Sequence, residues 1–389
     1  MRARLRAAVA LALAVGLLTA CTRDPTGPTG ETIRVGVVVA LSGPYRAVGE
    51  DLRDGFQLYL SAHQNRLGGR PVEVAVVDEA AGEAELVRQV TSLLGDRRLM
   101  AITGVTSAET TATLVPLLRD RHLPLVGSNG RPAVADLAAV WNTGFLPTEP
   151  GLALAAHVQS SVNGPVWTMG ANTQSGRDDV LGFAAALQAA GGRLANEGQT
   201  PLWTSATTNF LPYLAQARAN GAKAIYCHYE GAEAVSFVQQ YAQSDARDLP
   251  LFAAGMLTEG PILASQGRAA LGVQTVLNYT PDLDNPANRG FVDAWRGRHN
   301  TPPTTYAMAS WDAGLVLDKA MAAAGDEVTP DSLNAAIASL GQLDSPRGSW
   351  QFSPHHAPVQ KWYLRRVQTD GRTLTNALIE DLDTLGAQP

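Results

Sequence analysis

The sequence predicts an α/β protein built from two similar Rossmann-like lobes. From residue 33 onward, apolar runs typical of strands alternate with amphipathic runs typical of helices. Alternation of this kind predicts a parallel sheet with helices on both faces. The same series starts again at Gly151, after a first series that ends near residue 126. Because the two series are alike, we expect two similar lobes.

The first 32 residues lie outside the predicted fold. Arg2, Arg4 and Arg6 precede the uncharged apolar residues 7–20, a stretch shorter than the ~20 residues of a membrane span and typical of a secretory signal. The tetrapeptide that ends at Cys21 resembles the bacterial lipobox, which implies an acylated cysteine; the alternative is a plain signal with an incidental cysteine. We therefore expect a signal peptide at 1–20 and a flexible tether at 21–32, rich in Thr, Pro and Gly.

Composition and charge restrict the possible partners. The formal net charge is −6, and it becomes −9 when the three arginines of residues 1–20 are removed. Such a charge argues against binding to nucleic acid or to anionic lipid. The chain has two cysteines. If Cys21 carries lipid, Cys227 has no partner for a disulfide and is expected to be a buried small apolar residue.

The first lobe is predicted to begin with a central strand at 33–39, because this run has no polar alternation. Ser42, Gly43 and Pro44 end the run, and a helix that includes Phe56 follows. Further strands are expected at 71–77, 100–104 and 123–126, with helices at 85–94 and 110–119. The loop 42–49 therefore follows the carboxyl end of a strand, where open α/β sheets bind ligands.

The second lobe repeats this order. Helices are expected at 151–162, after Ser175 and at 210–219, and strands at 165–169 and 222–227. Beyond them the pattern is less regular: a strand at 273–279, a loop at 302–306, a long helix at 307–324 and a closing strand at 362–367. Taken alone, this end of the chain is also compatible with a third small domain.

Residues 33–60, IRVGVVVALSGPYRAVGEDLRDGFQLYL, resemble the opening of periplasmic solute-binding proteins of the leucine/isoleucine/valine-binding type. These are the receptors of branched-chain amino-acid ABC importers. The resemblance implies the type I periplasmic-binding fold, with the ligand in a cleft between the lobes and three crossings, near 146–148, 279–281 and 345–348. Lobe 1 is then 33–147 with 281–345, and lobe 2 is 148–280 with 346–380.

A second resemblance covers AITGVTSAETTATLVPLLRDRHLPLVGSNG and concerns ligand binding by lobe 1. Ser107 precedes a predicted helix, where a hydroxyl caps the helix and the free amides attract a carboxylate. The resemblance implies that Ser107 and the residues 128–130 hold the α-carboxylate and α-ammonium of an amino acid. Asn129 and Gly130 replace the Ala and Thr common in amino-acid binders, and a purely capping role for Ser107 remains open.

Three segments of lobe 2 resemble the opposing side of the site. In MGANTQSGRDD, Ser175 precedes Gly, where the family has an aromatic residue; in AIYCHYEGAEAVSFV, Glu230 stands where the family has tyrosine. In LFAAGMLTEG the family's carboxylate is replaced by Met256 or Leu257, and the nearest acid is Glu259. Because an ammonium buried without a carboxylate costs several kcal/mol, either Glu230 or Glu259 compensates, or the ligand is not a standard α-amino acid.

The expected site therefore draws on both lobes, and tyrosines could add flat faces with a polar tip. Its residues are Tyr45, Val48, Ser107, Thr110, Ser128, Asn129, Gly130, Ser175, Tyr229, Glu230, Met256, Leu257 and Tyr306. His228, His355 and His356 lack the spacing of a zinc site. The sequence contains neither a phosphate-binding P-loop nor the G-x-S-x-G motif of hydrolases.

From these observations we predict an extracytoplasmic solute-binding lipoprotein, anchored to the bacterial membrane at Cys21, without cofactor or metal and not an enzyme. It would capture a small polar ligand, an amino acid, amide or related carboxylate, as a monomer, and deliver it to an ABC permease. The first alternative is a sensory or regulatory binding protein on the same fold. The second is a catalytic protein on that fold, which the lack of an acid/base constellation disfavours.

Overall fold

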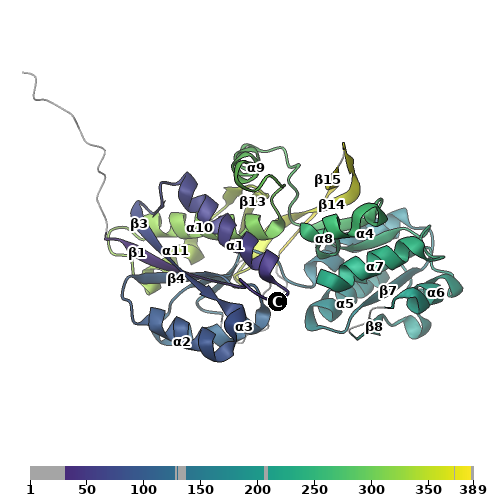
Figure 1. Ribbon diagram of the computed structural model, residues 1–389, viewed down its shortest axis with the longest axis horizontal. Coiled ribbons are helices and arrows are strands. Elements are labelled where there is room, and N and C mark those ends of the chain that lie inside the picture. The colour runs from purple at the N-terminus through teal and green to yellow at the C-terminus, as the bar shows by residue number, and fades with distance from the viewer. Residues whose placement is uncertain (1–30, 128, 130–136, 206–208, 372, 387–389) are drawn as a thin grey trace, which may run out of the picture.

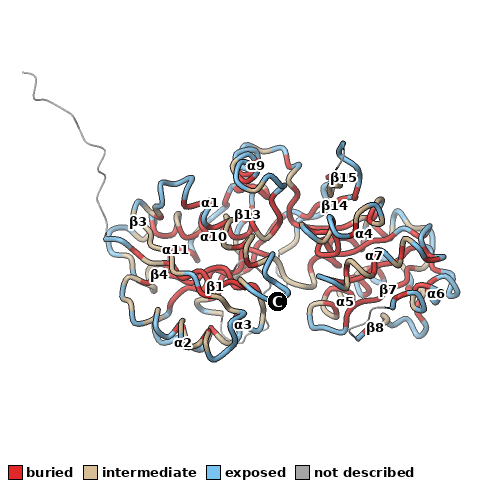
Figure 2. Tube along the Cα trace, in the orientation of Figure 1, coloured by how far each residue is buried: buried red, intermediate tan, exposed pale blue. Residues whose placement is uncertain are grey.

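The computed structural model describes residues 31–127, 129, 137–205, 209–371 and 373–386. The expected anchor Cys21 and the expected site residues Ser128 and Gly130 lie outside these ranges. The chain forms two lobes that lie side by side (Figure 1), each built on a mostly parallel sheet. In Figure 2 the central strands of both sheets are mostly buried, and most of the exposed positions lie on the surrounding helices and loops. The predicted α/β architecture of two similar lobes is confirmed.

Lobe 1 contains a six-stranded sheet in the order β2-β3-β1-β4-β5-β6. The parallel strands are β1 (Ile33–Val39), β3 (Arg70–Asp78), β4 (Leu99–Gly104), β5 (Leu125–Gly127) and β6 (Val140–Asn142), and β2 (Arg66–Leu67) is antiparallel. Its helices are α1 (Arg46–Ala62), α2 (Glu83–Leu94), α3 (Ala108–Leu118), α10 (Thr305–Ala323) and α11 (Pro330–Ser339). Side chains of α1, α10 and α11 form a core on one face of the sheet. Side chains of α2 and α3 form a second core on the other face. Strand β1 contributes to both cores and is buried between them.

Lobe 2 repeats this plan with parallel strands β7 (Val166–Ala171), β8 (Leu202–Thr204), β9 (Ala224–His228), β10 (Leu251–Ala254) and β11 (Gln274–Leu277). Its helices are α4 (Glu149–Ser161), α5 (Gln174–Ala189), α6 (Leu211–Ala219), α7 (Gly231–Gln243) and α8 (Pro261–Gln266). Helices α4 and α5 cover one face, and α6, α7 and α8 cover the other. In the part of the chain that the structure describes, the two lobes also contain five short 3-10 helices: η1 (Glu79–Ala81), η2 (Arg119–Arg121), η3 (Glu197–Gln199), η4 (Gly255–Thr258) and η5 (Gly267–Ala270).

The end of the chain differs most from the prediction. It forms α9 (Pro286–His299), β12 (Leu343–Ser345), β13 (Gly348–Phe352) and a long hairpin of β14 (Pro358–Asp370) and β15 (Thr373–Leu385). Trp350 and Phe352 pack in the core of lobe 1, and the ring centroids of Trp141 and Phe352 are 5.2 Å apart. Residues 350–352 therefore contribute to the core of the first lobe.

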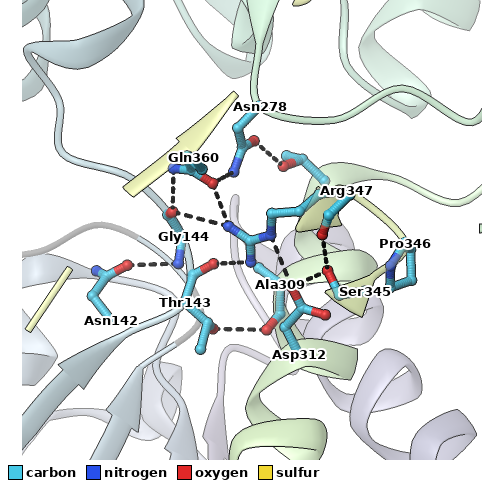
Figure 3. Close-up of polar contacts among 12 residues, drawn as sticks. Asn142, Thr143, Gly144, Asn278, Ala309, Asp312, Ser345, Pro346, Arg347 and Gln360 are labelled. Carbon is cyan, nitrogen blue, oxygen red and sulfur yellow. Dashed lines mark hydrogen bonds and ion pairs between the residues drawn. The ribbon is translucent and has the colours of Figure 1, made fainter. Parts of the chain in front are cut away.

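A buried arginine joins the three crossings (Figure 3). Arg347 is 2% exposed, and its Nε donates to Asp312 Oδ2 at 2.8 Å. The same guanidinium donates to Gln360 Oε1 and to the carbonyls of residues 143–144 on the first crossing. Asn278, on the second crossing, donates to the Oε1 of Gln360 at 2.9 Å. One guanidinium therefore links segments that are far apart in sequence.

Neither a membrane span nor a metal site is present in the part of the chain that the structure describes. No helix there is long and apolar enough to cross a bilayer. No three His, Cys, Asp or Glu side chains among the described residues are grouped so that they could hold a metal ion. Cys227 is a buried free thiol in β9, as its apolar surroundings in the sequence predicted.

Candidate ligand-binding site

The loops that follow the strands of one lobe face those of the other. Tyr45 precedes α1 in lobe 1, and Glu230 precedes α7 in lobe 2. Burial raises the pKa of Tyr45, and the charge of Glu230 raises it further. The hydroxyl of Tyr306, at the start of α10, contacts the Sδ of Met256 in η4. The carboxyl ends of both sheets therefore contribute side chains to one space between the lobes.

Ser107 caps α3 as the sequence predicted. Its Oγ accepts a hydrogen bond from the Thr110 N–H at 3.1 Å and donates to the Thr110 Oγ1 at 3.0 Å. Ser107 is partly buried, whereas Thr110 is 8% exposed and its hydroxyl is turned toward Ser107. Of this pair, Ser107 is the more exposed residue.

Sequence reasoning missed Glu79, which lies at the same helix end. Its Oε2 accepts a hydrogen bond from the Thr106 N–H at 3.1 Å. Burial raises the pKa of Glu79 to about 7, although hydrogen bonds from Thr106, Thr110 and Ser107 oppose the shift. A carboxylate of the protein thus already occupies part of the amide cradle expected to attract a ligand anion. The local signal was an acid directly after a strand end, next to Asp78.

The remaining lobe 1 residues have mixed surroundings. Tyr45 is 52% exposed, while Val48 packs against the core of the lobe. The Asn129 Nδ2 donates to the Thr106 carbonyl at 2.7 Å. This hydrogen bond links the loop after β5 to the loop after β4.

In lobe 2 the expected site residues separate into two groups. Ser175 lies in the first turn of α5, and its Oγ is 3.3 Å from the Oγ1 of the capping residue Thr173. In contrast, Tyr229 and Leu257 are each 1% exposed and belong to the core of this lobe. Tyr229 was expected at the ligand because it adjoins Glu230, and Leu257 because its segment resembles one that holds the ligand in the family; Tyr229 directly follows β9, and Leu257 lies in η4.

Glu230 ends a chain of buried polar contacts. His228 lies between two carboxylates: its Nδ1 is 2.8 Å from the Asp179 Oδ2, and its Nε2 is 3.1 Å from the Glu230 Oε1. The Tyr226 hydroxyl donates to Asp179 at 2.8 Å. Asp179 is fully buried, His228 is 6% exposed and the Glu230 side chain is 39% exposed. Of these hydrogen-bonded side chains, only Glu230 is substantially exposed to solvent.

The electrostatic interaction between His228 and its carboxylate neighbours favours the charged forms of His228 and Glu230. Burial alone would lower the pKa of His228, but the hydrogen bonds and charges of Asp179 and Glu230 outweigh it and raise the pKa to about 10. Burial would likewise raise the pKa of Glu230, and the hydrogen bond and charge of His228 hold it below its usual range. At neutral pH, therefore, Glu230 offers an ionised carboxylate between the lobes.

Glu259 has other partners. Its Oε2 lies 2.9 Å from the Arg365 Nη1, and its Oε1 accepts from the Thr305 N–H at 2.9 Å. Both charged side chains are buried, at 6% and 1% exposure. Nearby, the Thr304 hydroxyl donates to the Asp51 Oδ2 at 2.6 Å, and burial raises the pKa of Asp51 to about 7. Of the two acids that could compensate for the missing family carboxylate, Glu259 is already neutralised by Arg365.

Two similar lobes joined by three crossings, with polar strand-end loops facing each other, define a class of protein that binds small ligands between its lobes. The chain belongs to the periplasmic binding protein family, whose sequence model matches residues 32–372. A curated relative, the Leu/Ile/Val-binding protein homolog 6 of Brucella melitensis, is 26% identical over 367 residues, which cover 92% of this chain and 93% of the relative.

Solved structures agree with this assignment. A solute-binding protein of an ABC transporter from R. palustris, in complex with benzoate, is 27% identical with a TM-score of 0.75, over 92% of this chain and 100% of that chain. An ABC transporter substrate-binding protein from Sphaerobacter thermophilus is 25% identical with a TM-score of 0.82, over 91% and 99% of the two chains. The predicted family is confirmed, and with it a solute-binding protein of the ABC-transporter class that acts outside the cytoplasm and is not an enzyme.

Proposed function

We propose that this chain is anchored to the bacterial membrane by lipid on Cys21 and captures a small polar ligand with a carboxylate or equivalent acceptor, an amino acid, amide or related compound. It delivers this ligand to an ABC permease. The observation that carries the ligand-binding part of the proposal is the partly exposed Glu230 side chain of lobe 2, whose charge acts on Tyr45 of lobe 1 at the carboxyl ends of the two sheets. Ligands of open α/β sheets bind at such ends.

The two sides of the site differ in chemistry. On lobe 1, the Ser107 hydroxyl and the N-terminus of α3 favour an acceptor or anion. On lobe 2, Glu230 favours a hydrogen-bond donor or a cation. The branched-chain amino acids named for the Brucella relatives and the benzoate bound by the R. palustris protein all carry a carboxylate, which supports an acceptor at the lobe 1 side.

A thermal-shift screen tests the ligand class. The protein would be melted with amino acids, amides and aromatic carboxylates, since a ligand at a hundred times its Kd adds about 2.7 kcal/mol to the free energy of unfolding. We expect stabilisation by at least one carboxylate compound. If every compound that stabilises the protein lacks an acceptor group, the proposed role of the lobe 1 side is wrong.

Fractionation of cells that express Cys21→Ala tests the anchor. The variant should appear in the soluble fraction or accumulate as an unprocessed precursor, because its acylation site is absent. A variant that is still processed and still sediments with membranes would contradict a lipid on Cys21.

A further inference from the structure

We infer that Asp179 and His228 are positioning residues that hold Glu230 ionised and directed between the lobes, so that the site selects ligands with a positively charged group. This inference rests on the proposed function, because it requires that the ligand binds between the lobes. It adds a requirement to that proposal: a carboxylate alone is not sufficient for tight binding.

The first argument is the hydrogen-bonding capacity of His228. Both ring nitrogens lie within 3.1 Å of a carboxylate oxygen. An ionised carboxylate only accepts hydrogen bonds, so each nitrogen that faces one must carry a proton, and the ring is an imidazolium. Asp179 also accepts from the Tyr226 hydroxyl through both oxygens, at 2.8 and 2.9 Å. His228 is therefore a buried cation between two anions.

The second argument is what His228 does to the direction of Glu230. Glu230 is the N-cap residue of α7, but its side chain makes no capping hydrogen bond to that helix. Its Oε1 binds His228 instead, and we assign its Oε2 to the ligand. Asp179 in turn binds the opposite side of the imidazole ring, so neither His228 nor Glu230 is free to rotate. A charge-assisted hydrogen bond to a fixed oxygen is worth about twice a neutral one.

The third argument is the charge around Glu230. Burial is the largest cause of the raised pKa of Tyr306, and the charges of Glu230, Glu259 and Asp51 raise it further. Burial also raises the pKa of Tyr45, and the charges of Glu230 and Glu109 add to that shift. Among the described residues, His228 is paired with two carboxylates and Arg365 with Glu259. Because Arg365 offsets Glu259 while one imidazolium faces both Asp179 and Glu230, the Asp179–His228–Glu230 group keeps a net negative charge, which favours a ligand cation and disfavours an anion without one.

Paired probes that differ in one ammonium group test the selectivity. L-leucine would be compared with 4-methylpentanoate, and 4-(aminomethyl)benzoate with 4-methylbenzoate, by calorimetry on the full-length protein in detergent. In at least one pair the ammonium compound should bind at least tenfold more tightly. Glu230→Gln should remove this preference, and His228→Gln should reduce it at least threefold. Glu83→Gln, which removes an exposed acid at the start of α2 in lobe 1, should change the preference less than threefold.

A second measurement reports on His228 without a ligand and so separates positioning from mere structural support. In ¹⁵N spectra of the wild-type protein, both ring nitrogens of His228 should remain protonated from pH 6.5 to 9. A neutral ring at pH 7.5 would overturn the inference, as would simple acids that bind as tightly as their ammonium partners; in the latter case the proposed function stands. If folded wild-type protein binds neither probe class nor any compound of the wider screen, the proposed function itself fails.

Discussion

Replacement of Arg347 by methionine should destabilise the protein by about 3–5 kcal/mol at pH 7. The variant keeps an apolar stem of similar length. It leaves the Asp312 carboxylate buried, at 0% solvent exposure, without its ion-pair partner. It also removes donors to Gln360 and to the carbonyls of residues 143–144. The range is the free-energy cost of leaving one partner of a buried ion pair without the other. The substitution removes contacts among the segments that cross between the lobes (Figure 3).

Matched variants separate this effect from the loss of any arginine. Arg88 pairs with Glu85 on the surface of α2, where its side chain is 69% exposed. Arg88→Met should therefore shift the unfolding midpoint much less than Arg347→Met. The double variant Arg347→Met with Asp312→Leu removes both buried charges and should cost clearly less than Arg347→Met alone, because no unpaired carboxylate remains.

The assay is urea unfolding followed by tryptophan fluorescence and by circular dichroism, with the midpoints compared at equal slope. Burial already raises the pKa of Asp312, and the charge of Arg347 opposes this. Without Arg347 the carboxyl should take up a proton more readily, so the destabilisation should be smaller at pH 5 than at pH 8. If Arg347→Met costs no more than Arg88→Met, or if the double variant is as unstable as the single one, the reasoning from a buried ion pair is refuted.

Three further predictions follow from the charged groups of the site. Because burial raises the pKa of Asp51 to about 7 in the folded protein, Asp51→Asn should stabilise the protein by about 2 kcal/mol at pH 8 and have little effect at pH 3.5; an equal effect at both pH values would contradict this. Because the pKa of His228 is raised in the folded protein, its contribution to the free energy of unfolding is complete below the unfolded pKa of ~6.5. The contribution is lost as the pH rises toward 10, by at most about 1.4 kcal/mol per pH unit. Urea unfolding from pH 7 to 9 should therefore show a weaker pH dependence of stability for His228→Gln than for wild type, and identical slopes would argue against an imidazolium. Ser107→Ala should weaken binding of a carboxylate ligand about tenfold, whereas Glu79→Gln, which removes a neighbouring negative charge and keeps an acceptor for Thr106, should strengthen it in calorimetry at pH 8; unchanged affinity in both would place the ligand carboxylate elsewhere.

The order of strands and helices was predictable from the sequence because it depends on local patterns. The run 33–39 is apolar at every position but Arg34 and Gly36, and β1 is accordingly buried between two layers of helices. Ser107 was identified as a helix cap from its position before a helical pattern, and it caps α3. The resemblance of short segments also located Glu230 at a strand end. In each case the information lies within about ten residues along the chain.

Tertiary structure decided which of these groups are available to a ligand. Asp179 binds His228 across 49 positions of sequence, and Arg365 neutralises Glu259 across 106. No local pattern reveals such a partner, so the sequence left open which acid could meet a ligand cation. The pairing of Glu259 with Arg365 supports our proposal that Glu230 meets the ligand cation, because a buried charge requires an opposite charge nearby, and only the folded chain brings one to it.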